Sequence, residues 1–359
     1  MLIYVCSSSH GFGHAARDVA VLQQIRVQRP HWKLVISSRT SPAFLNTLIG
    51  DSDVGVRGCR WDVGMIQSDA LQVNRSRTLR ALQNLDQQLP SLIDQESRWI
   101  RQQNEPVLIL GDIPAAAADL ADRVGAVLVW MSNFGWDSIY QDQGESFAER
   151  AKEAQLSYRR GQHLLRCPFD LSMDWGIAES RIGLVCGDPR PLPTDLKVRL
   201  QALDSPVIQI GFGGLGLRFD PSLLSLWPDH HFVMASPSDP DIRRQLVSLK
   251  NVTLMPAGVR PLDLFPHCHR HLGKPGFSTF SEALTHHVGL HVVERSDFAE
   301  VRPLMEGLRR HGSHRELTRD QLMSGTWQLN QSLIPPTHHS LPTDGAEKAA
   351  QIIIGLAES

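Results

Sequence analysis

The alternation of short apolar runs with helical patterns constrains the fold of this chain more than any other feature of the sequence. Four runs in the first half have the length of a buried strand: residues 2–6, 34–36, 107–110 and 126–130. Residues 14–28 have apolar side chains at helical spacing, and a longer helix over residues 79–103 is expected to break at Pro90. Strands that alternate with helices are typical of parallel sheets, so the chain is expected to be an α/β protein.

The same alternation begins again after residues 186–193, which hold three prolines in eight residues and are typical of a linker. Further strands are expected at residues 206–210, 231–235, 252–255 and 290–294. A length of 359 residues suits two domains. We therefore predict two tandem doubly wound, Rossmann-like domains that face a central cleft, over residues 1–193 and 194–342. A C-terminal helix within residues 343–359 is expected to pack back toward the first domain.

The charge balance and the cysteine content exclude several classes of protein. Lys and Arg total 36 against 38 Asp and Glu, a net charge of −2, whereas nucleic-acid binders usually carry a basic face. Nucleic acid is therefore not an expected partner. The five cysteines stand at scattered positions, which is typical of reduced thiols in a cytoplasmic protein. No run reaches the roughly 18 apolar residues that cross a membrane, so no transmembrane segment is expected.

A strand that runs into a glycine-bearing loop and then a helix is the first candidate for a functional site. Gly11 and Gly13 permit close approach of the backbone to a ligand, and the following helix offers free N–H groups. His10 and His14 flank these glycines, and the positive end of the helix dipole favours the neutral imidazole that a general base needs. Alternatively, both histidines are polar loop or capping residues.

A carboxylate, Asp112, follows the apolar run at residues 107–110. Ligands of this architecture bind at the carboxyl ends of the strands, so Asp112 is placed to orient a histidine through a carboxylate–imidazole hydrogen bond. Alternatively, Asp112 caps the helix that is expected over residues 115–124.

A glycine followed by hydroxyl residues and a helix, within residues 276–284, is typical of an anion site. The N–H groups of residues 277–279 and the hydroxyls of this segment suit diphosphate oxygens, and Glu282 suits two ribose hydroxyls. Alternatively, Thr279 and Glu282 have the spacing of a capping box, in which each side chain bonds the other residue's backbone. The spacing does not separate these two interpretations.

Two further patterns are weaker. Gly211, Gly213 and Gly216 match a dinucleotide fingerprint, but a helix can begin only at Pro221. A loop that approaches a phosphate is compatible with these glycines, whereas nicotinamide binding is not expected. Residues 267–271 (His-Cys-His-Arg-His) resemble metal ligands, but alternate residues of a strand point to opposite faces. Metal binding is therefore not expected.

Five stretches of the sequence together resemble two-domain glycosyltransferases of the B-type fold. More specifically, the chain is similar to the glycosyltransferase-like N-terminal region of plant L-arabinokinases and its stand-alone bacterial relatives. The resemblance covers roughly residues 2–328 and is carried by residues 10–17, 111–114, 132–140, 272–284 and 295–300. The sugar-kinase half of arabinokinase is not part of it, so kinase activity is not expected.

The resemblance implies a role for individual residues. His14 corresponds to the general base, with His10 as its rival and Asp112 as its support. The residues implied to hold the donor are Gly211, Gly213, Gly214, Gly276, Phe277, Ser278, Thr279, Glu282, Arg295, Asp297 and Glu300. The residues implied to lie on the acceptor side are Gly11, Gly13, Arg17, Asn133, Trp136 and Asp137.

The function that follows is that of a hexosyl- or pentosyltransferase. It is expected to move a sugar from a UDP-linked donor to the hydroxyl of a small or lipid-linked acceptor, without a metal or a cofactor. Retaining enzymes of this fold often carry a second glutamate eight residues before the ribose glutamate, but Lys274 stands at that position, so inversion is expected. Two alternatives stay open: a non-catalytic sugar-nucleotide-binding regulatory module, and a sugar-nucleotide epimerase that uses Asp297 and Glu300.

Overall fold

Seven parallel strands form the sheet of the N-terminal half in a computed structural model, which describes residues 1–69, 72–213, 220–295 and 298–359. They are β1 (Leu2–Ser7), β2 (Lys33–Ser37), β3 (Gly55–Arg57), β6 (Val107–Asp112), β7 (Val127–Ser132), β8 (His163–Arg166) and β9 (Ala178–Arg181). Their order in the sheet is β3-β2-β1-β6-β7-β8-β9. Strands β1, β6 and β7 are almost wholly buried, because helices cover both faces, and their sequences are therefore continuous apolar runs.

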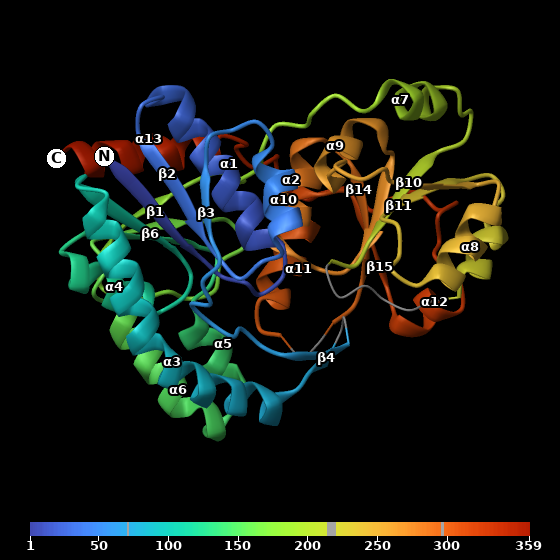
Figure 1. The fold of residues 1–359 in the computed structure, drawn as a ribbon. Coiled ribbons are helices and arrows are strands. Elements are labelled where there is room, and N and C mark those ends of the chain that lie inside the picture. Colours follow the sequence, from blue (N-terminus) through green and yellow to red (C-terminus); the bar gives the residue numbers. More distant parts are fainter. Residues whose placement is uncertain (70–71, 214–219, 296–297) are drawn as a thin grey trace.

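The helices of this half are α1 (Gly13–Gln28), α2 (Pro42–Ile49), α3 (Arg75–Gln102), α4 (Ala117–Val124), α5 (Trp136–Asp142), η1 (Glu145–Phe147) and α6 (Ala148–Tyr158). Figure 1 shows α3, α4 and α6 together on one side of this lobe, away from α1 and α2. A small antiparallel pair of strands, β4 (Gln67–Asp69) and β5 (Gln72–Val73), precedes α3.

The expected break at Pro90 is wrong, because α3 continues through it as one helix. Proline in a helix interior costs about 3 kcal/mol or more. Leu82 and Leu85 before Pro90 and Ile93 and Ile100 after it are all buried. Packing on both sides of the proline therefore holds the helix together where local sequence alone favours a break.

The C-terminal half repeats the architecture with six parallel strands. They are β10 (Val207–Gly211), β11 (His231–Met234), β12 (Val252–Leu254), β13 (Arg270–Gly273), β14 (Gly289–Val293) and β15 (His314–Leu317), in the order β12-β11-β10-β13-β14-β15. Its helices are α7 (Thr194–Gln201), η2 (Pro221–Leu226), α8 (Pro240–Ser248), α9 (Pro261–Leu264), η3 (Phe265–His267), α10 (Phe277–Thr285), α11 (Val301–His311) and α12 (Arg319–Met323). The prediction of two tandem parallel α/β units is confirmed.

The last helix, α13 (Gly345–Glu358), crosses back to the N-terminal lobe and packs against α1. Ala349 and Ile353 of α13 are fully buried in the core of that lobe. At the helix end, Arg29 Nε donates to Glu358 Oε1 at 2.7 Å. The core of the N-terminal lobe therefore contains residues from both ends of the chain.

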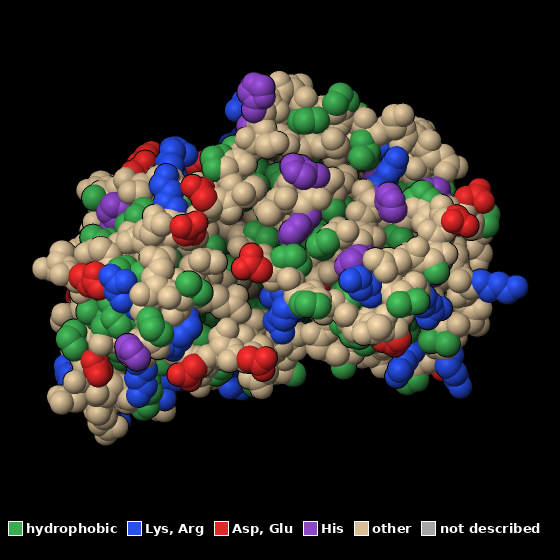
Figure 2. Space-filling view, turned by 90° about the horizontal axis from the view of Figure 1, so that it is seen from above, with side chains coloured by type: hydrophobic (Ala, Val, Ile, Leu, Met, Phe, Trp, Pro, Cys, Tyr) green, Lys and Arg blue, Asp and Glu red, His purple; other side chains and the backbone are tan. Residues whose placement is uncertain are grey.

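The surface carries no extended basic face in the view of Figure 2, where Lys and Arg side chains alternate with Asp and Glu. Several histidines lie near the middle of this face. Among the helices of the described residues, none combines the length and the apolar character needed to cross a bilayer.

Candidate functional site

A cleft of about 700 Å³ lies between the two lobes, at the carboxyl ends of both sheets. The N-terminal lobe lines it with the loop after β1, the first turns of α1, and Asn133 after β7. The C-terminal lobe lines it with Gly211 at the end of β10 and with residues between Lys274 and Glu282. This volume suits a ligand of small-molecule or cofactor size.

His14 and Asp112 meet at the floor of the N-terminal half of the cleft. Strands β1 and β6 are neighbours, with Ser7 opposite Asp112, so the helix that follows β1 starts beside the end of β6. His14 Nδ1 lies 2.8 Å from Asp112 Oδ1. Arg17 Nη2 also lies 3.1 Å from Nδ1, but it has Asp112 Oδ1 and Ser132 Oγ as acceptors. We therefore assign the proton to Nδ1, because the carboxylate only accepts, and this leaves the lone pair of His14 on Nε2.

Arg17, one turn further along α1, holds the same carboxylate. Its Nε donates to Asp112 Oδ2 at 2.5 Å, its Nη2 also donates to Oδ1, and its Nη1 donates to Asn133 Oδ1 at 2.8 Å. Burial alone would raise the pKa of Asp112, but the Arg17 guanidinium and His14 outweigh burial and hold this pKa below its usual range. Asp112 is therefore an ionised carboxylate, and the alternative that it caps α4 is wrong, because Ala116 holds the cap position.

His10 has a different environment from His14. Its ring lies between Phe298, stacked at a centroid distance of 5.5 Å, and Trp136, at 5.3 Å. Burial, helped by the nearby positive charges of Lys274 and Arg295, lowers the pKa of His10 to about 3. His10 is therefore a neutral side chain in an aromatic setting.

Two hydrogen bonds cross the cleft and bring the lobes together. Ser278 Oγ, in the first turn of α10, donates to the carbonyl of Gly13 at 2.9 Å. A Cβ at residue 13 would lie 2.9 Å from the same Oγ, so glycine permits this approach. Asn133 Nδ2 donates to Glu300 Oε1 at 2.8 Å. The predicted acceptor-side and donor-side segments therefore face each other.

The start of α10 excludes the capping-box alternative. Gly276 is the cap residue and the helix begins at Phe277, which places Thr279 already inside the first turn. No side-chain hydrogen bond caps this helix. Glu282 instead lines the cleft, where burial raises the pKa of its carboxyl to about 8.

The C-terminal half of the cleft gathers glycines and cations at the ends of β10 and β13. Gly213 has a φ of +75°, and a Cβ there would lie 3.4 Å from Lys274 Cε. Lys274 and Arg295 line the cleft, and Arg295 also lies 4.9 Å from the ring centroid of Phe298. These groups can meet a negatively charged ligand.

His271 lines the cleft, but the sequence analysis did not predict it as a site residue and noted it only as part of the histidine-rich residues 267–271. It is 4% exposed, and its Nδ1 lies 3.1 Å from Gln209 Oε1, while Nε2 has no hydrogen-bond partner among the described residues. Burial lowers the pKa of His271 to about 4. Its position just before the end of β13 is the signal that could have identified it, since ligands bind at strand ends.

Most of the predicted site residues that the structure describes line this cleft; the exceptions are Asp112, which is fully buried beneath His14, and Trp136 and Asp137. Asp137, predicted on the acceptor side, accepts from Trp175 Nε1 at 2.9 Å and lies outside the lining. Trp136 packs behind His10 and donates to Asp62 Oδ2 at 3.0 Å. Gly214 and Asp297 lie outside the described residues. Asn133 and Phe134, which follow β7, line the cleft, whereas Trp136 and Asp137 in the first turn of α5 do not.

The histidine cluster at residues 267–271 is divided between η3, a connecting segment and β13, and of its members only His271 lines the cleft. No group of three His, Cys, Asp or Glu side chains in the described part of the chain has the arrangement of a metal site. The nicotinamide fingerprint cannot be placed, because Gly216 also lies outside the described residues.

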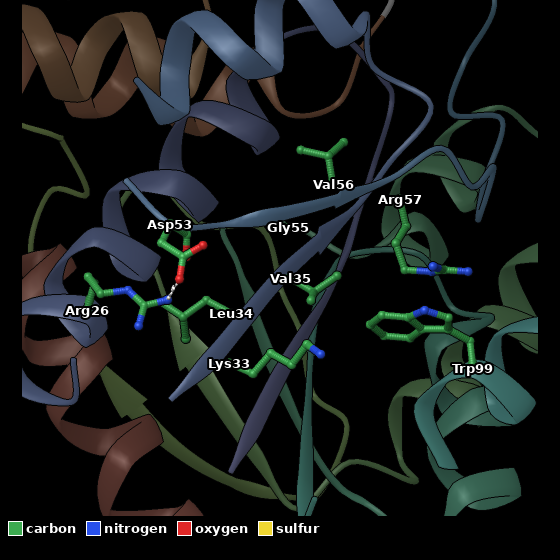
Figure 3. A pocket seen from close by; sticks show the side chains of 9 residues that line it. All are labelled: Arg26, Lys33, Leu34, Val35, Asp53, Gly55, Val56, Arg57 and Trp99. Carbon is green, nitrogen blue, oxygen red and sulfur yellow. Dashed lines mark hydrogen bonds and ion pairs between the residues drawn. The ribbon is translucent and has the colours of Figure 1, made fainter. Parts of the chain in front are cut away.

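A smaller hollow of about 220 Å³ lies along β2 and β3 at the edge of the N-terminal sheet (Figure 3). Its cations are engaged in the protein itself: Arg57 pairs with Glu96, and Arg26 lies 3.7 Å from Asp53. Arg57 also lies 4.1 Å from the ring centroid of Trp99. We assign the candidate site to the large cleft, because there a carboxylate-bound imidazole faces an uncapped helix start.

Comparisons with known proteins agree with this architecture. No protein family model matches the chain. L-arabinokinase of Arabidopsis thaliana is 25% identical over 356 residues, which cover 96% of this chain and 33% of that protein. The chain thus spans about a third of the length of this relative.

Solved structures match along nearly the whole chain. UGT89C1 of Arabidopsis thaliana complexed with UDP-L-rhamnose has a TM-score of 0.58 at 13% identity, covering 99% of this chain and 93% of that one. UGT2 of Phytolacca americana, complexed with UDP-2fluoro-glucose and pterostilbene, has a TM-score of 0.61 at 14% identity, covering 99% and 94%. A UDP-glucosyltransferase from Polygonum tinctorium has a TM-score of 0.61 at 13% identity, covering 99% and 93%. The chain therefore has the glycosyltransferase B-type fold, as predicted.

Proposed function

We propose that this protein transfers a sugar from a UDP-linked donor to a hydroxyl acceptor, with inversion at the anomeric carbon. One observation carries the proposal: the imidazole of His14, held by Asp112, lies in the same cleft as the start of α10. The solved structures that hold UDP-sugars in the same fold support a donor of this class.

The proposed reaction is a direct displacement. The acceptor oxygen attacks the anomeric carbon, the bond from that carbon to the diphosphate oxygen breaks, and its electron pair leaves with UDP. The acceptor proton moves to Nε2 of His14, while Nδ1–H donates to Asp112 and stabilises the imidazolium that forms. Such a base contributes roughly 10²–10⁴-fold to the rate.

Negative charge develops on the diphosphate of UDP as it leaves. The C-terminal lobe supplies the groups that are proposed to stabilise this charge. The N–H groups at the start of α10 and the Lys274 ammonium both face the cleft. Preorganised donors in a site shielded from water stabilise developing charge strongly. The proposal therefore needs no metal ion.

Glu282 is proposed to accept hydrogen bonds from the ribose hydroxyls. At pH 9, where the carboxyl is mostly ionised, replacing Glu282 with alanine is expected to weaken UDP binding about tenfold, since hydrogen bonds to a charged group contribute about 1.5–3 kcal/mol. The melting temperature should not fall, because the carboxyl caps no helix. Isothermal titration calorimetry with UDP and a thermal melt measure the two effects. Unchanged UDP affinity with a lower melting temperature would assign Glu282 a structural role instead.

The raised pKa of Glu282 predicts a pH dependence of UDP binding. With a pKa of about 8, the carboxyl is mostly protonated at pH 7.5 and mostly ionised at pH 9. The ionised form accepts from both ribose hydroxyls, so UDP affinity should rise about three- to fourfold over this range, in which the phosphates stay fully charged. Glu282→Gln is the matched control and should show a flat profile. If the UDP affinity of the wild type is as independent of pH as that of the control, the proposed contact between the carboxylate and the ribose is refuted.

A panel of UDP-sugars tests the function itself. The transferase is supported if at least one UDP-sugar releases UDP slowly on its own and releases it faster when a hydroxyl acceptor is added. Tight binding without UDP release would support the regulatory module, a possibility favoured by the match to part of a longer protein. A changed sugar without UDP release or an acceptor would point to the epimerase.

A further inference from the structure

The N-terminal half of the cleft is strongly basic although the whole chain carries a net charge of −2. Arg39, Arg60 and Arg77 line it from three separate elements: the loop before α2, the loop after β3 and the start of α3. Among the described residues that line the cleft from this lobe, none is Asp or Glu. The two acidic lining residues, Glu282 and Glu300, belong to the C-terminal lobe.

These three arginines are available to a ligand. Arg39, Arg60 and Arg77 are exposed, and none of them takes part in an ion pair with any residue that the structure describes. Arg17, the fourth arginine that lines this half, instead forms an ion pair with Asp112. The donor diphosphate does not require the three exposed arginines, because Lys274 and Arg295 line the opposite half.

The backbone holds these arginines in place around an apolar floor. Residues that follow Arg60 are anchored, since Trp61 Nε1 donates to Ser37 Oγ at 2.8 Å. Arg77 is held at the start of α3, where its backbone N–H donates to Asn74 Oδ1 at 3.0 Å. The same half of the lining holds Thr40, Ser41 and Gln67, together with an apolar floor that consists of Phe12, Phe44, Leu48, Val63, Met65 and Ile66. Phe12 and Phe44 stack at a centroid distance of 4.0 Å, and Phe12 directly precedes α1, which carries His14.

We propose that the acceptor is an amphipathic molecule with an anionic group, a carboxylate or a phosphate, bound by Arg39, Arg60 and Arg77. Its apolar part lies on the Phe12–Phe44 surface, and its hydroxyl points to His14. Three exposed arginines that have no ion-pair partner among the described residues favour an anionic acceptor over a neutral one, because an anionic group forms charge-assisted hydrogen bonds with a guanidinium. The inference rests on the proposed function and adds the class of its acceptor.

Binding of matched probes to the UDP-saturated protein tests this inference. The carboxylate pair is 4-hydroxyphenylacetate and its methyl ester, and the phosphate pair is glycerol 3-phosphate and glycerol. At least one anion is expected to bind about tenfold more tightly than its neutral partner. The pair with the larger difference in affinity shows whether the site prefers a carboxylate or a phosphate. Equal affinities within both pairs would overturn the inference. UDP binding is measured first, so that failure of the donor site is recognised separately.

Charge variants locate the effect. The triple variant Arg39→Gln, Arg60→Gln, Arg77→Gln should lose the tenfold preference for the anion while its affinities for UDP and for the neutral probe stay unchanged. Arg80→Gln is the matched control, since Arg80 is exposed on the same helix as Arg77, one turn on, and does not line the cleft. The single variant Arg77→Gln is compared directly with Arg80→Gln. If both lose the same amount of anion preference, the effect is one of general charge, and the assignment of the anion site to the three arginines is overturned.

Discussion

Replacing His14 with alanine is expected to lower turnover by about 10²–10⁴-fold while the affinity for UDP stays within about twofold of the wild type. The loss follows from the proposed role of Nε2 as the only proton acceptor for the attacking hydroxyl. UDP affinity should persist because the groups proposed to hold the diphosphate belong to the C-terminal lobe. Initial rates of UDP release at saturating acceptor, together with UDP titration calorimetry, measure the two quantities.

The neighbouring histidine provides the control for this experiment. His10→Ala removes an imidazole from the loop just before α1. This imidazole packs between Phe298 and Trp136 and lacks the carboxylate partner that His14 has. We expect His10→Ala to change the acceptor KM more than turnover. Full activity in His14→Ala, with activity lost in His10→Ala, would transfer the role of base to His10.

Replacing Asp112 with alanine is expected to destabilise the N-terminal lobe by about 3–5 kcal/mol. Asp112 is fully buried and Arg17 is 3% exposed, so the variant leaves the guanidinium without its counterion in the protein interior. Chemical denaturation followed by tryptophan fluorescence measures the change. Arg244→Ala, which removes an exposed ion pair with Asp241, is the control and should cost less than about 1 kcal/mol.

A double variant separates stability from chemistry. Arg17→Met with Asp112→Leu removes both charges, and an apolar pair of similar size often restores most of the lost stability. Activity should stay low in this variant, because His14 has lost the carboxylate that orients it. A stable Asp112→Ala protein would contradict the buried ion pair, and an active double variant would contradict the positioning role of Asp112.

The same ion pair predicts the behaviour of the protein in acid. The folded protein holds the pKa of Asp112 below its usual range, so the carboxyl is ionised in the native state more readily than in the unfolded chain. The stabilisation is present above the ordinary carboxyl pKa of about 4 and is lost as the pH falls below it. The stability of Asp112→Asn should therefore decrease less between pH 5 and pH 3 than that of the wild type.

Local patterns predicted the elements that are buried on both faces. Strands β1, β6 and β7 are continuous apolar runs and β10 is one interrupted by Gln209, and each begins or ends within one or two residues of the expected position. Strand β9 was not predicted, because its sequence Ala-Glu-Ser-Arg is polar and lies at the edge of the sheet. Edge strands bury little surface, so neighbouring backbone rather than side-chain pattern decides where they form.

The sequence by itself determined the two parallel α/β units and the segments that carry polar residues at strand ends, because burial of both faces of a sheet leaves a direct record in the residue pattern. Only the tertiary structure decided which of those residues act together. Asp112 and Glu282 each had a local interpretation as capping residues, and contacts with residues far away in sequence excluded it for Asp112, while the start of α10 at Phe277 excluded it for Glu282. Asp137 was predicted on the acceptor side but does not line the cleft, because it lies in the first turn of α5 and bonds Trp175 instead. Spacing along the chain constrains one element at a time, whereas a site depends on the distances between elements, which packing sets.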